Sequence, residues 1–135
     1  MSIPQSTPSN CIKIACGFDA AAASGDTNTP IGLFPLAPGQ SIASWIVREK
    51  RHPTNPIPLT GPVNVKAGTN YPDCDNIIQG VSNSVGQQLY REGPGRYAND
   101  GDLPHDPPQT VYAYIDSQSI EGTIFIEFMV HLLPA

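Results

Sequence analysis

The sequence predicts an all-β protein, a single-domain β-sandwich or jelly-roll-like fold with an extended N-terminal arm and long Pro/Gly-rich loops. Three observations predict it. Fifteen prolines and twelve glycines in 135 residues interrupt helices and favour short strands joined by shaped loops. Apolar residues alternate with polar ones near both ends of the chain, as in half-buried strands. Turn signals return roughly every ten residues, and no internal repeat indicates a propeller or solenoid.

A chain of 135 residues fits one domain, because a domain near this size buries roughly two-thirds of the surface that its unfolded chain exposes. We divide it into an arm, residues 1–10, and a sandwich domain, residues 11–135. In the arm, Pro4 and Pro8 lie among polar residues. This composition buries too little apolar area to offset its ordering entropy, which predicts an extended segment.

Alternation predicts the first strand at Cys11 to Phe18. Its apolar side consists of Ile12, Ile14, Cys16 and Phe18, and its other side consists of Cys11, Lys13, Ala15 and Gly17. Ala20 to Pro30 has no apolar period and is interpreted as a loop. The Pro38-Gly39 pair predicts a turn before a strand at Ser41 to Arg48, which holds the only tryptophan, Trp45.

The middle of the chain has weaker signals. Four prolines between Pro53 and Pro62 block ladder hydrogen bonds, which predicts an edge or a loop. Short strands are expected at Val63 to Ala67, Asn76 to Val81 and Val85 to Tyr90. Glu92 to Gln109 contains four prolines and three glycines and no period, which predicts a long loop, and long ordered loops usually carry contacts.

The clearest strand signals stand near the end of the sequence. Val111 to Asp116 and Thr123 to Leu133 flank Ser117 to Gly122 and predict a hairpin. One face of the second strand is apolar throughout. The other face is mixed, which predicts that it is half covered, and it consists of Thr123, Phe125, Glu127, Met129, His131 and Leu133.

Composition excludes several classes of function. Only 14% of the residues are charged, against about 25% in an average domain, which suits a surface partly covered by partners. A net charge of −5 is the wrong sign for nucleic-acid binding. No apolar run reaches the roughly 18 residues that a membrane span needs, and the first ten residues do not resemble a signal peptide, so we expect a cytoplasm-like compartment. Three cysteines without a C-x-x-C pair predict reduced, mostly buried thiols.

The candidates for chemistry are outweighed by ordinary roles. Asn99 to Asp102, with His105 and Asp106, offers oxygen and imidazole ligands without the spacing of a calcium loop, and turn formation is favoured. Asp73 and Asp75 are likewise interpreted as turn residues. The three histidines lie far apart and accompany no nucleophile motif. We expect no catalytic residue, no cofactor and no metal.

Arginine and tyrosine are favoured anchors at protein interfaces. Arg91 and Arg96 bracket the turn at residues 93–95, beside Tyr90 and Tyr97, and this segment is the better contact candidate. The basic cluster at residues 48–52 is equally well explained as an ordinary solvated strand end.

The layout of the chain resembles the head decoration, or capsid cement, proteins of tailed bacteriophages. The resemblance is carried by LFPLAPGQSIASWIV, by GPVNVKAGT and by TVYAYIDSQSIEGTIFIEFMVHLL, which cover about half of the chain. It implies a non-catalytic viral structural protein, a β-sandwich that associates as a trimer and binds the major capsid protein. It implies a place on the capsid surface of a virion, after synthesis in the host cytoplasm.

The hypothesis assigns partner binding to the arm and to the long loop. The residues concerned are Ile3, Pro4 and Pro8 in the arm and Arg91, Arg96, Tyr97 and His105 in the loop. A second hypothesis is a receptor-binding fibre-tip module of a phage tail that recognises glycans through Trp45 or the tyrosines. A third is a small enzyme that gathers His105, Asp102 and Asp106 in an apolar pocket.

Overall fold

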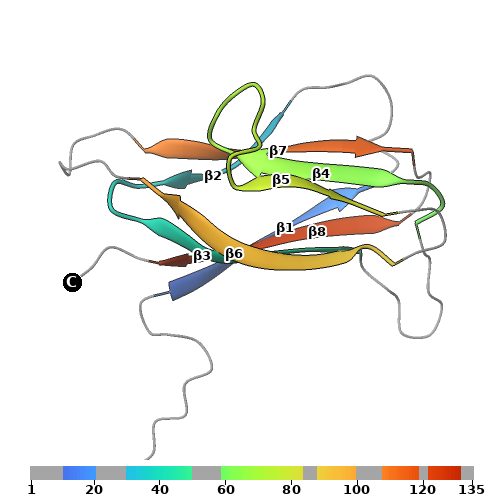
Figure 1. Ribbon diagram of the computed structural model, residues 1–135, viewed down its shortest axis with the longest axis horizontal. Coiled ribbons are helices and arrows are strands. Elements are labelled where there is room, and N and C mark those ends of the chain that lie inside the picture. The colour runs from blue at the N-terminus through green and yellow to red at the C-terminus, as the bar shows by residue number, and fades with distance from the viewer. Residues whose placement is uncertain are drawn as a thin grey trace, which may run out of the picture.

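The computed structural model describes residues 11–20, 30–49, 59–83, 88–99, 108–118 and 122–131, and these residues form two packed β-sheets (Figure 1). The strands are β1 (Cys11–Asp19), β2 (Ile31–Leu36), β3 (Ser41–Glu49), β4 (Val63–Gly68), β5 (Ile78–Ser82), β6 (Tyr90–Ala98), β7 (Gln109–Ser117) and β8 (Thr123–His131). Within these ranges no helix is long and apolar enough to cross a membrane. The predicted all-β sandwich is confirmed.

The two sheets have four strands each, and every pair of neighbouring strands is antiparallel. The first sheet has the order β1-β8-β3-β6 and the second has the order β2-β7-β4-β5. Successive strands alternate between the sheets, except that β4 and β5 are neighbours in one sheet. This strand order is that of an eight-stranded jelly roll.

The core lies between the sheets and is built from the alternate residues that face inward. β8 contributes Ile124, Ile126, Phe128 and Val130, and β7 contributes Val111, Ala113 and Ile115. The ring of Phe128 meets that of Phe34 on β2 edge to face, with centroids 5.3 Å apart. Each fully buried aliphatic or aromatic side chain contributes about 1.5–3 kcal/mol to folding, so these inward rows stabilise the sandwich.

The hairpin predicted from the end of the sequence is wrong. β7 pairs with β2 and β4 in the second sheet, whereas β8 pairs with β1 and β3 in the first. The chain therefore changes sheet after β7. Alternation shows that both strands have an apolar face, but it cannot distinguish two faces that lie side by side from two that pack against each other across a core.

The long loop predicted at Glu92 to Gln109 is wrong in its first part. Strand β6 extends from Tyr90 to Ala98 and pairs with β3, at the edge of the first sheet. Pro94 is tolerated there because an edge strand has one side free of ladder hydrogen bonds. Residues 100–107 lie outside the described residues.

Two further strand predictions need correction. The strand expected at Val85 to Tyr90 begins only at Tyr90, since Gln88 and Leu89 precede β6 and residues 84–87 lie outside the described residues. Strand β2 was not predicted. It contains Pro35 and is an edge strand of the second sheet, where the missing amide hydrogen is tolerated.

The other predictions agree with the structure where it describes them. Strands β1, β3, β4 and β5 lie where alternation predicts them, within one or two residues. The turn at Pro38-Gly39 is present, with Gly39 at a φ of 87° and a hydrogen bond from the Gln40 amide to the Ala37 carbonyl of 3.0 Å. A positive φ at this place favours glycine.

Candidate binding surfaces

The structure places the predicted partner-binding residues on a strand or leaves them outside the description. Arg91 and Tyr97 lie on β6, and so does the backbone of Arg96, whose side chain is not among those described. The arm residues Ile3, Pro4 and Pro8, and His105, lie outside the described residues. The contacts assigned to all seven residues remain predictions, but three of them belong to a sheet edge and not to a loop.

Tyr97 already has partners within the chain. Its hydroxyl accepts a hydrogen bond from Thr69 Oγ1 at 2.8 Å and donates one to the side-chain oxygen of Gln109. Thr69 follows β4 and Gln109 begins β7, so the phenol links β6 to the opposite sheet. Tyr97 therefore holds the two layers together at this end of the sandwich.

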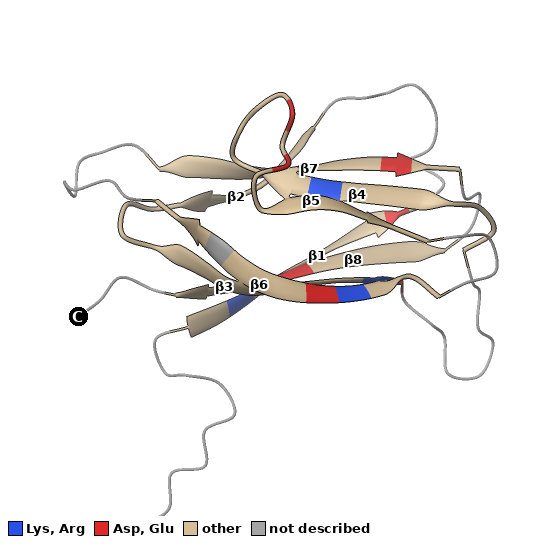
Figure 2. Ribbon diagram, in the orientation of Figure 1, with Lys and Arg blue, Asp and Glu red and all other residues tan. Residues whose placement is uncertain are grey.

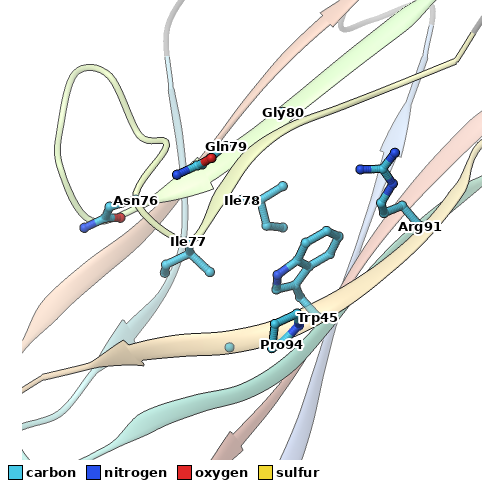
Figure 3. Close-up of a pocket in the computed structure, with 9 residues that line it drawn as sticks. Trp45, Asn76, Ile77, Ile78, Gln79, Gly80, Arg91 and Pro94 are labelled. Atoms are coloured by element: carbon cyan, nitrogen blue, oxygen red, sulfur yellow. The ribbon is translucent and has the colours of Figure 1, made fainter.

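Strand β6 also borders a groove at the side of the sandwich where the edge strands β5 and β6 lie opposite each other (Figures 1 and 3). The groove has a volume of about 500 Å³, within the range of small binding sites. Figure 3 shows Trp45 between Ile77 and Ile78 on one side and Pro94 on the other, with Arg91 beside the indole.

Glycine at position 93 is what allows Trp45 to lie there. A Cβ built on Gly93 would lie 2.4 Å from Cζ2 of the indole, so the ring occupies the space of the missing side chain. Trp45 is 9% exposed, and no open ring face is offered to a sugar. Trp45 is therefore unsuited to the glycan-stacking role in the second hypothesis.

The outer face of the first sheet carries a compact charged cluster. Glu127 on β8 bonds Lys13 on β1 at 2.9 Å and Arg48 on β3 at 3.2 Å, and Arg48 lies over the ring of Phe125 at 4.8 Å. The hydrogen bond from Lys13 and the nearby Arg48 lower the pKa of Glu127, although burial opposes them. The prediction that this face of β8 is half covered is confirmed, since Phe125, Met129 and His131 are half-buried.

The outer face of the second sheet carries tyrosines. Tyr112 on β7 meets Tyr71, from the segment after β4, with ring centroids 5.1 Å apart, and Lys66 on β4 lies over Tyr114 at 4.8 Å. Tyr71 is 58% exposed. An exposed aromatic ring can stack on a partner. This surface is therefore compatible with the second hypothesis, glycan binding through the tyrosines.

The cysteines agree with the prediction of reduced, mostly buried thiols. All three are free, Cys11 and Cys74 are buried, and Cys16 is half-buried. Cys11 Sγ lies 3.0 Å from Nδ1 of His131, its cross-strand neighbour. Burial raises the pKa of the Cys16 thiol, and burial together with Asp73 and Asp75 raises that of Cys74. Neither is prepared as a nucleophile, because the thiolate is the reactive form.

The acidic residues weighed for chemistry form turns where the structure describes them. Asp75 accepts a hydrogen bond from Asn70 Nδ2 at 2.6 Å, while its own amide donates to Asn70 Oδ1. The side chain of Asn99 is buried and donates to the Leu36 carbonyl at 2.8 Å. Across the described ranges, no group of three or more His, Cys, Asp or Glu residues could hold a metal ion. Asp102, His105 and Asp106 lie outside these ranges.

Comparison with known proteins gives a result for structure alone. No protein-family model matches, and no curated protein matches the sequence. The structure is similar to a chain in the acidic stable capsid structure of Helicobacter pylori bacteriophage KHP30, with 11% identity and a TM-score of 0.63 over 93% of this chain and 90% of that one.

Two further chains match with lower TM-scores. One is a chain of the cyanophage Pam1 capsid asymmetric unit, with 12% identity and a TM-score of 0.47 over 98% and 92% of the two chains. The other is from Bacillus endospore appendages, described as disulfide-linked pili, with 12% identity and a TM-score of 0.46 over 99% and 98%. The KHP30 match, with its TM-score of 0.63, supports the fold described above.

Proposed function

We propose that this chain is a structural protein of a phage capsid, and that its role there is that of a decoration or cement protein. It binds the major capsid protein on the outer surface of the shell, as a trimer, and stabilises the particle without catalysing a reaction. The arm, residues 1–10, acts with the sandwich domain, residues 11–135, in this attachment.

The observation that carries the proposal is the likeness in fold to a chain of the KHP30 capsid structure, which extends over 93% of this chain and 90% of that one. Because the match extends over nearly the whole of both chains, the likeness concerns the entire fold and not a single hairpin. Jelly rolls are widespread in viral shells.

The surface supports a binding role. Charged residues are sparse on the ribbon, and the described cluster on the first sheet is paired internally (Figure 2). Weak contacts of an uncharged surface gain strength when many copies meet a repeating lattice, because linked binding events raise the effective concentration.

The test uses shells of the source phage that lack this chain. We expect the purified chain to co-sediment with the shells, to appear as added outer density by cryo-electron microscopy, and to be a trimer by light scattering. A chain without residues 1–10 should keep its β-type circular dichroism spectrum and bind more weakly. Shells that remain bare in the presence of excess wild-type chain would contradict the proposal.

The tyrosines of the second sheet support a second candidate, a glycan-binding module of a tail fibre tip. Tyr71 is exposed and packs at a tilt against Tyr112, a contact that restricts its ring before a sugar binds. A glycan array tests this candidate. Binding that disappears in a Tyr71→Ala variant would support it, and an array without any bound glycan would remove it.

A further inference from the structure

The groove between β5 and β6 contains two polar groups that have no partner among the described residues. The indole Nε1 of Trp45 donates no hydrogen bond to any described residue, and the guanidinium of Arg91 has no ion pair with any described acid. Both groups are donors only. The groove therefore offers hydrogen-bond donors and a positive charge, and it is suited to an occupant with acceptors and a negative charge.

The position of Arg91 on its strand is unusual. Cross-strand pairing sets Arg91 opposite Val47 and Gly93 opposite Trp45, and both of these β3 residues are buried in the core. Arg91 therefore lies on the inward side of β6, yet it is exposed because the sandwich is open there. Figure 3 shows its guanidinium at the groove, on the side of the indole away from Pro94.

The groove has both apolar and polar lining residues and is bordered by strand edges. Ile77 lies on one side and Pro94 on the other, and Asn76 and Gln79 add polar side chains. β5 and β6 are the edge strands of their sheets, so each has backbone groups on one side that pair with no other strand of the described chain. An extended polypeptide matches such a border, because its own backbone pairs with a free edge while alternate side chains enter the groove.

We propose that this groove binds an extended segment of the major capsid protein in which an Asp or Glu residue is flanked by apolar residues. The carboxylate pairs with the guanidinium of Arg91, and an acceptor of the segment, a backbone carbonyl, takes the hydrogen bond of Trp45 Nε1. The apolar neighbours pack on Ile77 and Pro94. This inference rests on the proposed function and adds to it the site and the chemistry of the partner segment.

A simpler role for Arg91 competes with the proposal. Charged residues that point inward on edge strands, and prolines such as Pro94, prevent two sheets from pairing edge to edge. If that is the whole role of Arg91, its replacement will cause self-association and will leave shell binding unchanged. The two roles therefore predict different results for one substitution.

The first experiment measures shell binding of Arg91→Glu, with Lys66→Glu as the matched control. Both variants change one positive charge to a negative one, but Lys66 lies on the outer face of the second sheet over Tyr114. We expect Arg91→Glu to weaken binding at least roughly tenfold, because an ion pair that loses water on binding is replaced by a repulsion. Lys66→Glu should bind within about threefold of wild type, as expected for a charge outside the interface.

The second experiment uses the single tryptophan of the chain as a reporter of the groove. The chain is labelled with 5-hydroxytryptophan, which is excited at longer wavelengths than the tryptophans of the shell. Binding to shells should shift the emission of residue 45 and protect it from acrylamide quenching. Neither change should occur when the shells are first saturated with unlabelled wild-type chain.

The outcomes separate this inference from the proposed function. If wild-type chain binds shells while Arg91→Glu binds equally well and the label at residue 45 is unaffected, the groove proposal is wrong and the proposed function stands. If Arg91→Glu or Arg91→Ala chains self-associate but bind shells as wild type does, Arg91 serves to protect the sheet edge. That result would also overturn the groove proposal. Wild-type chain that binds no shell would overturn both.

Discussion

The two edge strands of the first sheet, β1 and β6, are built in different ways. β1 pairs with β8 along all nine of its residues without a shift in register. β6 also has nine residues, but its pairing with β3 shifts between Ile42 and Ser44, and it carries Gly93, Pro94 and Gly95 in succession. One edge is regular and the other is irregular, although both close the same sheet.

The difference lies in what fills the inner side of each strand. β1 supplies its own apolar side chains, and Ile14 and Phe18 pack against the core. β6 has Gly93 opposite Trp45, and the indole of Trp45 from β3 takes the space that a side chain at residue 93 would occupy. Because the indole of Trp45 fills only part of the space beside β6, an opening remains where the ring ends. The groove lies at that opening.

The largest effect is expected when the side chain that supports β6 is removed. Trp45→Ala should lower the free energy of unfolding by about 3 to 5 kcal/mol, because a large core side chain is lost and a cavity remains. Phe18→Ala on β1 should cost about 1 to 2 kcal/mol, since Phe18 is only partly buried. Urea unfolding followed by circular dichroism measures both variants. If both variants lost the same free energy of unfolding, Trp45 would support its edge of the sheet no more than Phe18 supports β1. That result would contradict the comparison.

A smaller effect is expected from adding one methyl group to either edge. A Cβ on Gly95 would lie 1.5 Å from the backbone oxygen of Ile42, so Gly95→Ala must displace the strand, at a cost of about 2 to 3 kcal/mol. A Cβ on Gly17 of β1 would lie 3.0 Å from the ring of Phe125, a side chain that can move aside. Gly17→Ala should therefore cost less than about 1 kcal/mol.

Denaturant midpoints of these two variants sharpen the comparison between the edges. The expected order is wild type, then Gly17→Ala, then Gly95→Ala. If Gly95→Ala were as stable as wild type, the close approach of β6 to β3 would not be a feature of the folded protein.

The smallest effect concerns the charged cluster that ties β1 to the sheet. The pKa of Glu127 is lower in the folded chain than its ordinary value of 4.5. A lowered folded pKa gives stability that is present above the unfolded pKa and is lost as the pH falls through the folded pKa. Wild-type chain should therefore lose stability below about pH 4.5, and Glu127→Gln should lose less over the same range.

The size of this difference is limited, because partly exposed ion pairs are each worth about 0.2 to 1 kcal/mol. Thermal unfolding at several pH values, at low and high salt, measures it. An acid dependence in Glu127→Gln as steep as that of wild type would show that other carboxylates determine the response to acid.

Sequence alone predicted β1 and β3, and it located both β7 and β8, because in these strands the alternation of apolar and polar residues is a property of the strand itself. It did not predict β6, whose inward residues Arg91, Gly93 and Gly95 show no apolar period. The need for glycine in β6 comes from its partner strand, since the buried Trp45 on β3 occupies the space of a side chain at residue 93.

The candidate site also depends on a partner strand and could not be predicted from local sequence. Sequence singled out Arg91 and Trp45 separately, one as a loop contact and the other as a ring that stacks on sugars, and nothing in their spacing joined them. The pairing of β3 with β6 brings the two residues to one groove. The error in the hairpin has the same origin, because the assignment of β7 and β8 to different sheets depends on contacts far apart in the chain.

The amino-acid sequence by itself determined that this chain forms an all-β sandwich, because prolines, glycines and two-residue alternation are local and act wherever the chain folds. Only the tertiary structure decided which strands share a sheet, which edge is left open and which donors meet there. Those features depend on side chains from distant strands competing for the same space, and that competition is settled by packing.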